Sequence, residues 1–133
     1  MTARYSGWMQ KIRLLPAKMA ILQYDAGVQP DIPYFAQIRT AEETSLVVEE
    51  AHAPARTTAG LRHRSTGWRM FEVLGPFALD AVGILASIAT PLANAKISIF
   101  ALATFNTDYI LIRGLQVKRA VQALRNAGHT VIE

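Results

Sequence analysis

The sequence predicts an α+β fold of two related halves, and three observations lead to this prediction. The chain has 133 residues, 51% of them hydrophobic and 18% charged, which is typical of a globular protein rather than a disordered one. Residues 68–133 are expected to form a strand, a helix, two strands, a helix and a strand, which is the ferredoxin-like order. Residues 17–67 contain strand patterns with weakly marked helices, and we interpret them as a degraded copy of the same half.

The first half begins after residues 1–16, which we expect to be an N-terminal extension. Residues 18–25 are predicted to form its first strand. Residues 35–40 alternate between polar and apolar side chains, as a half-buried strand does, and residues 44–48 are rich in β-formers. Residues 51–67 lack clear periodicity and are expected to connect the halves, so the predicted boundaries are 17–67 and 68–133.

The second half opens with residues 68–77, which are apolar on both faces and predict an interior strand. Asp80 is a favourable N-cap for the helix that follows. The expected apolar face of that helix comprises Val82, Leu85, Ile88 or Ala89, and Leu92. Pro91 predicts a kink or an early end.

Residues 96–113 are predicted to form two strands around a polar break at Asn106, Thr107 and Asp108. This break is either a simple hairpin turn, since Asn and Asp dominate turns, or a turn that faces a ligand. A last helix carries Val117, Val121 and Leu124 on one face, and Gly128 is placed to end it in the left-handed conformation. Residues 129–133 can then form a short final strand.

The composition argues against several classes of function. The chain has no cysteine, which excludes thiolate metal sites and cysteine nucleophiles. Its serines lie in no nucleophile motif and its three histidines lack metal-ligand spacing, so we expect no enzyme activity, no metal and no cofactor. Residues 73–93 are apolar, but Gly75-Pro76 and Pro91 interrupt them, so a membrane span is not expected. The absence of a signal-peptide pattern favours a cytoplasmic protein.

The net charge of +4 raises the question of nucleic-acid binding. The basic residues are scattered, and Arg62-His63-Arg64 is their densest point, which favours an ordinary solvated surface over a phosphate-binding patch. The order of elements is shared with RNA-recognition motifs, but no basic and glycine-rich framework surrounds Phe100 and Phe105. We therefore predict no nucleic-acid partner.

The helix after residue 80 offers a way to bind an amino acid. Its N-terminus would expose unpaired N–H groups that suit a carboxylate, and Gly83 would allow a ligand to approach the backbone. Asp80 or Asp108 could supply the negative partner of an ammonium group. Each residue also has a structural interpretation: capping for Asp80, helix packing for Gly83, and turn formation for Asp108.

Three segments carry a resemblance to a known family: GPFALDAVGILASIATPLANAKISIF (75–100), ISIFALATFNTDYILI (97–112) and ALRNAGHTVIE (123–133). They resemble the ACT-domain signature, in the branch of small bacterial proteins with two ACT-like halves to which the animal cytosolic arginine sensors are also similar. The resemblance covers residues 17–133 and is strongest over 68–133.

The resemblance implies a regulatory module that binds an amino acid near a domain interface, forms a homodimer and controls another protein, such as an enzyme. The ligand-binding residues that it implies are Asp80, Ala81, Val82, Gly83, Ile84, Ala103, Thr104, Phe105, Asn106 and Asp108. In the arginine-sensing branch the residue after the loop Asp is acidic, whereas here it is Ala81, which leaves the ligand open. The alternative is a dimerisation or partner-binding module without a ligand.

Overall fold

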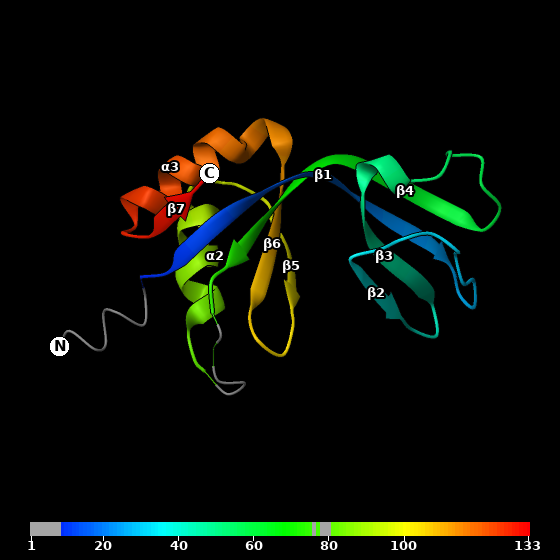
Figure 1. The fold of residues 1–133 in the computed structure, drawn as a ribbon, viewed down its shortest axis with the longest axis horizontal. Helices are drawn as coiled ribbons and strands as arrows, with labels where there is room; N and C mark the ends of the chain where they lie inside the picture. Colours follow the sequence, from blue (N-terminus) through cyan, green and yellow to red (C-terminus); the bar gives the residue numbers. More distant parts are fainter. Residues whose placement is uncertain (1–8, 76, 78–80) are drawn as a thin grey trace. The chain divides into compact units, whose positions relative to one another are not determined.

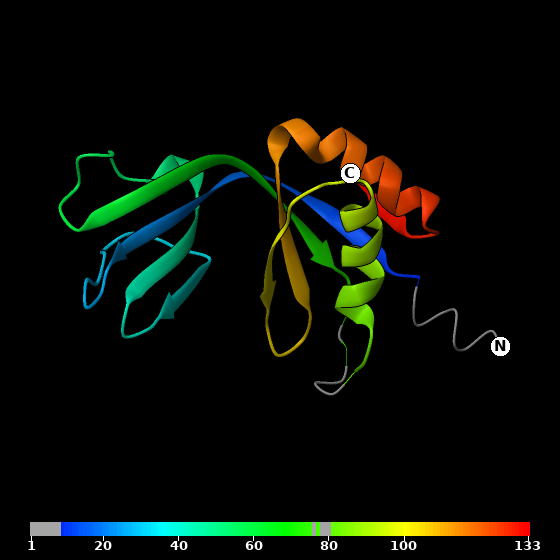
Figure 2. The same ribbon diagram turned by 180° about the vertical axis from the view of Figure 1, so that it is seen from behind.

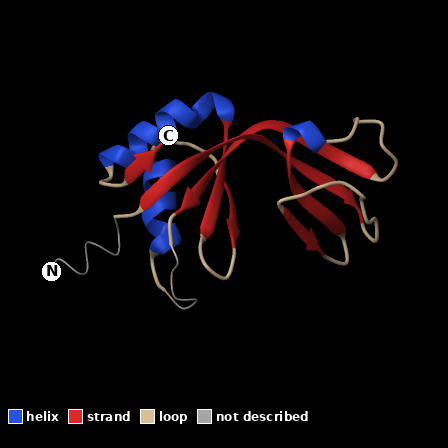
Figure 3. Cartoon of the chain, in the orientation of Figure 1, coloured by secondary structure: helices blue, strands red, loops and turns tan. Residues whose placement is uncertain are grey.

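A computed structural model describes residues 9–75, 77 and 81–133, and it divides the chain into two compact units. Unit 1 combines the described part of Met1–Pro16 with Arg69–Glu133, and unit 2 consists of Ala17–Trp68. Two long strands, β1 (Lys11–Asp25) and β4 (Leu61–Val73), contribute one segment to each unit (Figure 1). Strands dominate the fold, as Figure 3 shows, and the predicted α+β class is confirmed.

Unit 2 is a sheet whose strands follow the ferredoxin-like order without the two helices. β2 (Ala36–Arg39) and β3 (Glu43–Glu49) complete it in the order β2-β3-β1-β4. β1 and β3 pair antiparallel, from Met19 opposite Glu49 to Asp25 opposite Glu43. Where helices would lie, unit 2 has loops and the short 3₁₀ helix η1 (Glu50–His52). The core side chains Leu22, Tyr24 and Leu46 are therefore covered by loop residues such as Val28 and Ile32. The interpretation of this half as a degraded copy agrees with that arrangement.

Unit 1 contains both α-helices of the described residues. After its segment of β4 come α2 (Ile84–Asn94), β5 (Phe100–Ala103), β6 (Asp108–Arg113), η2 (Gly114–Gln116), α3 (Val117–Asn126) and β7 (Thr130–Ile132). Ile88 and Leu92 of α2 and Val121 and Leu124 of α3 are buried in one cluster with strand residues such as Phe71. This element order is the predicted ferredoxin-like one.

The prediction of residues 1–16 as an extension is wrong for their described part. Lys11 to Arg13 pair in parallel with β7, and the Leu74 N–H donates to the Lys11 carbonyl at 2.8 Å. The strand order in unit 1 is therefore β7-β1-β4-β6-β5, with the N-terminal segment inserted between β7 and β4. Burial explains the difference, because the side chain of Ile12 is fully buried in the core of unit 1.

The first strand of the second half also begins earlier than predicted. β4 starts at Leu61, inside the segment 51–67 that was expected to be a connection, and ends at Val73 instead of residue 77. In unit 2, β4 is the outermost strand of the sheet, and Arg62 and His63 are exposed. Exposed polar side chains on an edge strand hide the alternation on which the sequence prediction depends.

Helix α2 begins three residues later than an Asp80 cap would require. Its N-cap is Gly83, with φ at 85° in the left-handed region that glycine adopts readily, so the prediction of Asp80 as N-cap is wrong. Asp80 itself lies outside the described residues. The later start also changes the buried face, which contains Ser87, Ile88 and Leu92, whereas Val82 and Leu85 are exposed. None of the helices in the described ranges has the length and apolar character needed to cross a bilayer.

The C-terminus of α3 follows the sequence prediction. Gly128 adopts a φ of 99°, the Gly128 N–H donates to the Arg125 carbonyl at 3.0 Å, and the His129 N–H donates to the Leu124 carbonyl at 3.1 Å. This pair of bonds is the Schellman motif that commonly ends helices at glycine. It turns the chain into β7 and places His129 inside unit 1, where its side chain is buried.

Candidate functional site

A cavity of about 320 Å³ lies in unit 1 between the first turn of α2 and the β5–β6 hairpin. Figure 2 shows the start of α2 and the tip of the hairpin at the same end of this unit. The cavity is lined by Phe77, Ala81, Gly83, Ile84, Leu85, Ala86, Ala103, Thr104, Phe105, Asn106, Thr107 and Asp108. Most of these side chains are apolar, and the polar ones all belong to the hairpin.

The hairpin turn is held together by its two threonines. The Thr104 N–H donates to the Thr107 carbonyl at 2.8 Å, and the Thr107 N–H donates to the Thr104 hydroxyl oxygen at 3.2 Å. The Thr107 hydroxyl donates in turn to the carbonyl of Val73 on β4. The turn therefore has its own hydrogen bonds, and it is anchored to the neighbouring strand.

Asn106 and Asp108 take no part in these bonds. Among the described residues neither side chain has a hydrogen-bond or ion-pair partner. The local bonds that usually account for Asn and Asp in turns are made here by threonine side chains and the backbone. The amide of Asn106 and the carboxylate of Asp108 are thus available to a ligand in the cavity.

Burial changes the acidity of Asp108. Partial burial at the start of β6 raises the pKa of its carboxyl above the ordinary value of 3.8, because desolvation disfavours the charged form. It is the only charged side chain among the described residues that line the cavity. A positively charged group of a ligand would relieve this cost by pairing with the carboxylate.

The first turn of α2 offers backbone donors on the opposite wall. The first N–H groups of a helix have no partners within it, and here Gly83 brings no side chain to cap them. No acidic residue occupies this first turn. Ile84, Leu85 and Ala86 line the cavity, so a positively polarised helix end faces it together with the Asp108 carboxylate.

Next to the cavity, the backbone at Gly75 approaches the hairpin tip closely. The Phe77 N–H donates to the Asn106 carbonyl at 2.9 Å, which ties the segment after β4 to the hairpin tip. A Cβ atom at Gly75 would lie 2.9 Å from that same carbonyl oxygen and 2.9 Å from the Phe77 nitrogen. Only glycine fits this position without movement of the hairpin.

The fold brings together most of the residues that the sequence singled out. Ala81, Gly83, Ile84, Ala103, Thr104, Phe105, Asn106 and Asp108 line the cavity. Val82 does not line it and is 92% exposed, whereas Asp80 lies outside the described residues. Phe105 lines the cavity and is 75% exposed.

Four lining residues were not predicted: Phe77, Leu85, Ala86 and Thr107. Thr107 lies within the predicted polar break, directly between Asn106 and Asp108, and this position is a signal that could have identified it. Leu85 was expected on the buried face of the helix because the predicted helix start was misplaced.

Among the described residues that line the cavity, Asp108 is the only carboxylate and none is a histidine. In the described ranges no three His, Asp or Glu side chains are grouped so that they could hold a metal ion. The features of the site are those of a binding site: an apolar cavity, a helix N-terminus, an amide and a carboxylate.

Comparison with known proteins adds a family and several relatives. The family model of the ACT domain matches residues 64–126. The chain is 31% identical over 97 residues to subunit 1 of the rat cytosolic arginine sensor for mTORC1, and 48% identical over 46 residues to the human protein. These alignments span 29% and 14% of the length of the sensors, so the chain corresponds to less than a third of either protein.

Solved structures match nearly the whole chain. A protein from Agobacterium tumefaciens is 30% identical, with a TM-score of 0.81 over 93% of this chain and 92% of that one. The regulatory subunit of aspartate kinase from Thermus flavus is 13% identical, with a TM-score of 0.63 over 87% of this chain and 95% of that one. The second likeness is one of fold.

Proposed function

Because the chain belongs to the ACT-domain family, we propose that it is a regulatory protein that binds a small amino acid in the cavity of unit 1. The observation that carries this proposal is the pairing of two complementary sites across one cavity. The N-terminus of α2 suits a carboxylate, and Asp108 suits an ammonium group. An α-amino acid carries both groups on one carbon atom.

The cavity favours a small ligand with an uncharged side chain. Its volume of about 320 Å³ is at the lower end of the range of ligand pockets, which runs from roughly 300 to 1,000 Å³. Asp108 is the only charged lining residue that the structure describes, so the ammonium group would use the one carboxylate present. The related sensors are named for arginine, whose guanidinium would need a further acceptor. An amino acid with a short or apolar side chain therefore fits the described lining better than arginine.

The regulatory role would be exerted on another protein. We propose a cytoplasmic homodimer without catalytic activity that transmits the ligand-bound state to a partner, such as an enzyme. The proposed site residues are Asp80, Ala81, Val82, Gly83, Ile84, Thr104, Phe105, Asn106 and Asp108. Phe77, Leu85, Ala86 and Thr107 join this set because they line the cavity.

The exposed apolar groups at the cavity support a second candidate, a partner-binding module without a ligand. Phe105 and Leu85 line the cavity and are 75% and 41% exposed. Exposed large apolar side chains around a depression are typical of protein–protein contacts. In that case the cavity would receive a side chain of a partner or of a second copy of this chain.

Thermal unfolding against each of the twenty amino acids at millimolar concentration tests the proposal. A ligand that binds only the folded state stabilises it by about 2.7 kcal/mol at 100 times its dissociation constant. We expect a rise in Tm with one or a few small amino acids and none with the others. If all twenty leave Tm unchanged, the module without a ligand is the better function.

A further inference from the structure

A second cavity lies in unit 2 beside the outermost strand of its sheet. Its volume is about 230 Å³, and it is lined by Arg56 together with Leu61, Arg62, His63, Arg64 and Ser65 of β4. Successive side chains of a strand point to opposite faces, so a cavity that touches five consecutive residues follows the edge of the strand. The sequence predicted an ordinary solvated surface around residues 62–64, but the fold adds Arg56 and a cavity to this cluster.

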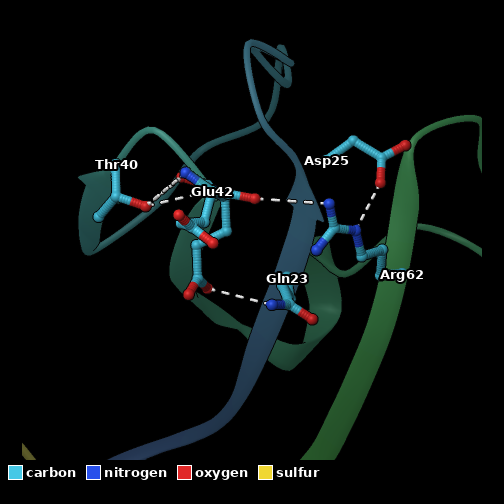
Figure 4. Close-up of polar contacts among 6 residues, drawn as sticks. Gln23, Asp25, Thr40, Glu42 and Arg62 are labelled. Atoms are coloured by element: carbon cyan, nitrogen blue, oxygen red, sulfur yellow. Dashed lines mark hydrogen bonds and ion pairs between the residues drawn. The ribbon is translucent and has the colours of Figure 1, made fainter.

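One of the three arginines is already neutralised. The Arg62 Nε–H donates to the Asp25 carboxylate at 2.6 Å, and an Arg62 terminal amino group donates to the Glu42 carbonyl at 3.4 Å. Figure 4 shows the guanidinium of Arg62 directed at Asp25 and Glu42. Arg62 therefore contributes to the wall of the cavity but has little free charge to offer.

Arg64 is oriented without being neutralised. Its Nε–H donates to the Pro54 carbonyl at 2.9 Å, which fixes the plane of the guanidinium. Its two terminal amino groups have no protein partner in the ranges that the structure describes, and no carboxylate lies within ion-pair distance. An arginine held in this way can donate hydrogen bonds from both terminal amino groups to an anion in the cavity.

The other donors come from a loop with its own hydrogen bonds and from the strand. Arg56 lies on a turn closed by the Thr58 N–H to the Ala55 carbonyl at 3.0 Å. Within the described residues the side chains of Arg56 and His63 have no hydrogen-bond partner. The Ser65 hydroxyl oxygen accepts the Trp68 indole N–H at 2.9 Å, so its own proton remains available.

We propose that this cavity binds a compact oxyanion, namely phosphate or a small molecule that carries a phosphate group. Two guanidinium groups without carboxylate partners, an imidazole and a hydroxyl are donors suited to phosphate oxygens. The volume is below the roughly 300–1,000 Å³ of sites for larger ligands, which favours a small anion. Nucleic acids are usually bound by an extended row of cations, whereas here two uncompensated arginines converge on one cavity. The proposal is independent of the amino-acid site, which lies in unit 1.

NMR of the full chain tests the proposal directly. We would titrate inorganic phosphate and then pyrophosphate at constant pH and constant ionic strength, and follow the ¹⁵N and ¹H shifts of the arginine Nε–Hε groups. The expected result is saturable movement of the Arg56 and Arg64 signals, with tighter binding of pyrophosphate. Arg119 on α3 serves as an internal reference that should not move.

Three variants within the cavity and one control elsewhere separate a fitted site from general positive charge. Arg56→Gln and Arg64→Gln should each weaken phosphate binding by about tenfold or more, since hydrogen bonds to charged groups are the strong ones. Arg64→Lys retains the charge but loses the planar fork, and it should also bind less tightly. Lys118→Gln in unit 1 makes the same change of charge elsewhere and should bind as the wild type does. Arg56 lies on an exposed turn, so its variant tests the site even if Arg64→Gln unfolds.

Three results would overturn the proposal. The first is a linear, non-saturating response to phosphate, and the second is an Arg56→Gln variant that binds phosphate as well as the wild type. The third is tighter binding of a short oligonucleotide, with affinity that falls steeply as salt rises, which would assign the surface to nucleic acid instead.

Discussion

The ionised carboxylate of Asp108 would favour ligand binding, but it lowers the stability of the folded protein. Burial raises the pKa of its carboxyl in the folded state. The protonated form is therefore favoured by folding, and its stabilising contribution is present below the unfolded pKa of 3.8 and lost as the pH rises through the folded pKa. At neutral pH the ionised carboxylate is a cost that only a positively charged ligand group would offset.

The variant Asp108→Asn should separate these two effects. Without ligand at pH 7 we expect it to be at least as stable as the wild type in urea unfolding, and the difference should disappear below pH 3.8. Amino-acid binding should be weaker by about 1.5–3 kcal/mol, the usual value of a hydrogen bond to a charged group. Asp31→Asn, an exposed acid on a loop of unit 2, is the matched control and should change neither quantity. Unchanged binding in Asp108→Asn would assign the carboxyl to the hairpin alone.

His129 is a buried residue that bonds through both ring nitrogens. Its Nδ1 accepts the Gln10 N–H at 2.9 Å, so the ring proton is on Nε2, which donates to the Ser87 carbonyl at 2.7 Å. The neutral Nε2–H tautomer therefore joins the chain before β1 to helix α2. These bonds give His129 a structural role in unit 1.

Replacement of His129 by Phe should be strongly destabilising. The ring volume is nearly retained, but a buried N–H and a buried carbonyl lose their partners at a cost of about 1–3 kcal/mol each. We expect a loss of roughly 2–6 kcal/mol in the free energy of unfolding, measured by urea denaturation. His52→Phe, at an exposed position in η1, provides the comparison. A loss of less than about 1 kcal/mol would mean that water replaces the ring.

At the scale of the elements, Pro91 explains why α2 needs His129. A proline has no N–H, so the carbonyl four residues earlier in a helix loses its bond. For Pro91 that carbonyl belongs to Ser87, and it is the one that accepts the His129 Nε2–H. The sequence predicted a kink or an early end at Pro91, but α2 continues to Asn94. The imidazole replaces the missing donor, a compensation from a residue 42 positions away that no local pattern could reveal.

A double-mutant cycle between positions 91 and 129 tests this compensation. Pro91→Ala restores an N–H that can reach the Ser87 carbonyl, so it should stabilise the His129→Phe background by about 1 kcal/mol more than it stabilises the wild type. The unfolded-state effect of removing proline is the same in both backgrounds and cancels in the cycle. Urea unfolding of the four proteins gives the coupling energy. Additive effects within about 0.3 kcal/mol would show that the two positions are independent.

The β5–β6 hairpin depends on its neighbour at Gly75. Gly75→Ala would place a Cβ atom 2.9 Å from the Asn106 carbonyl oxygen, so the hairpin tip must shift. We expect a loss of about 1–3 kcal/mol in the free energy of unfolding, typical of overpacking, together with weaker amino-acid binding. Gly67→Ala is an informative control because no atom lies within 4 Å of its Cβ position, although its φ of 79° adds strain. That variant should lose stability while ligand affinity is retained. A Gly75→Ala protein that binds ligand normally would show that the tip does not form part of the site.

The accuracy of the sequence prediction depended on whether the pattern of each element was local. The end of α3 was predicted because Gly128 and the apolar spacing of Val117, Val121 and Leu124 are local signals. The start of α2 was misplaced because Asp80 resembles a cap, whereas the chain uses Gly83 in the left-handed conformation. Most residues that line the cavity were named from the sequence, since both of its walls are short contiguous segments, and their role in binding stays a prediction. What could not be predicted is which turn residues bond to each other: Thr104 and Thr107 do so, and Asn106 and Asp108 remain available.

At the scale of the whole molecule, β1 and β4 are the two strands that run from one unit into the other. Each strand contributes its two segments to different units. Unit 1 therefore combines two separate pieces of sequence, the described part of Met1–Pro16 and Arg69–Glu133, whereas unit 2 is the contiguous segment Ala17–Trp68 between them. The sequence suggested tandem halves because each has the strand order of a ferredoxin-like domain. The pairing of Lys11 to Arg13 with β7 joins residues about 119 positions apart, and nothing in the local pattern near Pro16 indicates it. Non-local strand pairing of this kind is set by burial of the whole unit rather than by propensity.

This arrangement predicts that the second half does not fold alone. A fragment of residues 68–133 would lack Ile12 in its core, and β7 would lose the strand with which it pairs. Burial of a large aliphatic side chain contributes about 1.5–3 kcal/mol, and an unpaired buried strand adds the cost of its free N–H and C=O groups. We therefore expect poorly dispersed amide signals in the ¹H–¹⁵N spectrum of the fragment.

A peptide of residues 9–17 should restore the folded spectrum of that fragment if the inserted strand is the missing part. A peptide with Ile12→Asp is the matched control, because it retains the backbone donors and acceptors but cannot enter the core. A fragment that unfolds cooperatively without any peptide would mean that residues 68–133 suffice for a stable domain. The N-terminal strand would then be an addition to unit 1, and the amino-acid site could be studied in the fragment by itself.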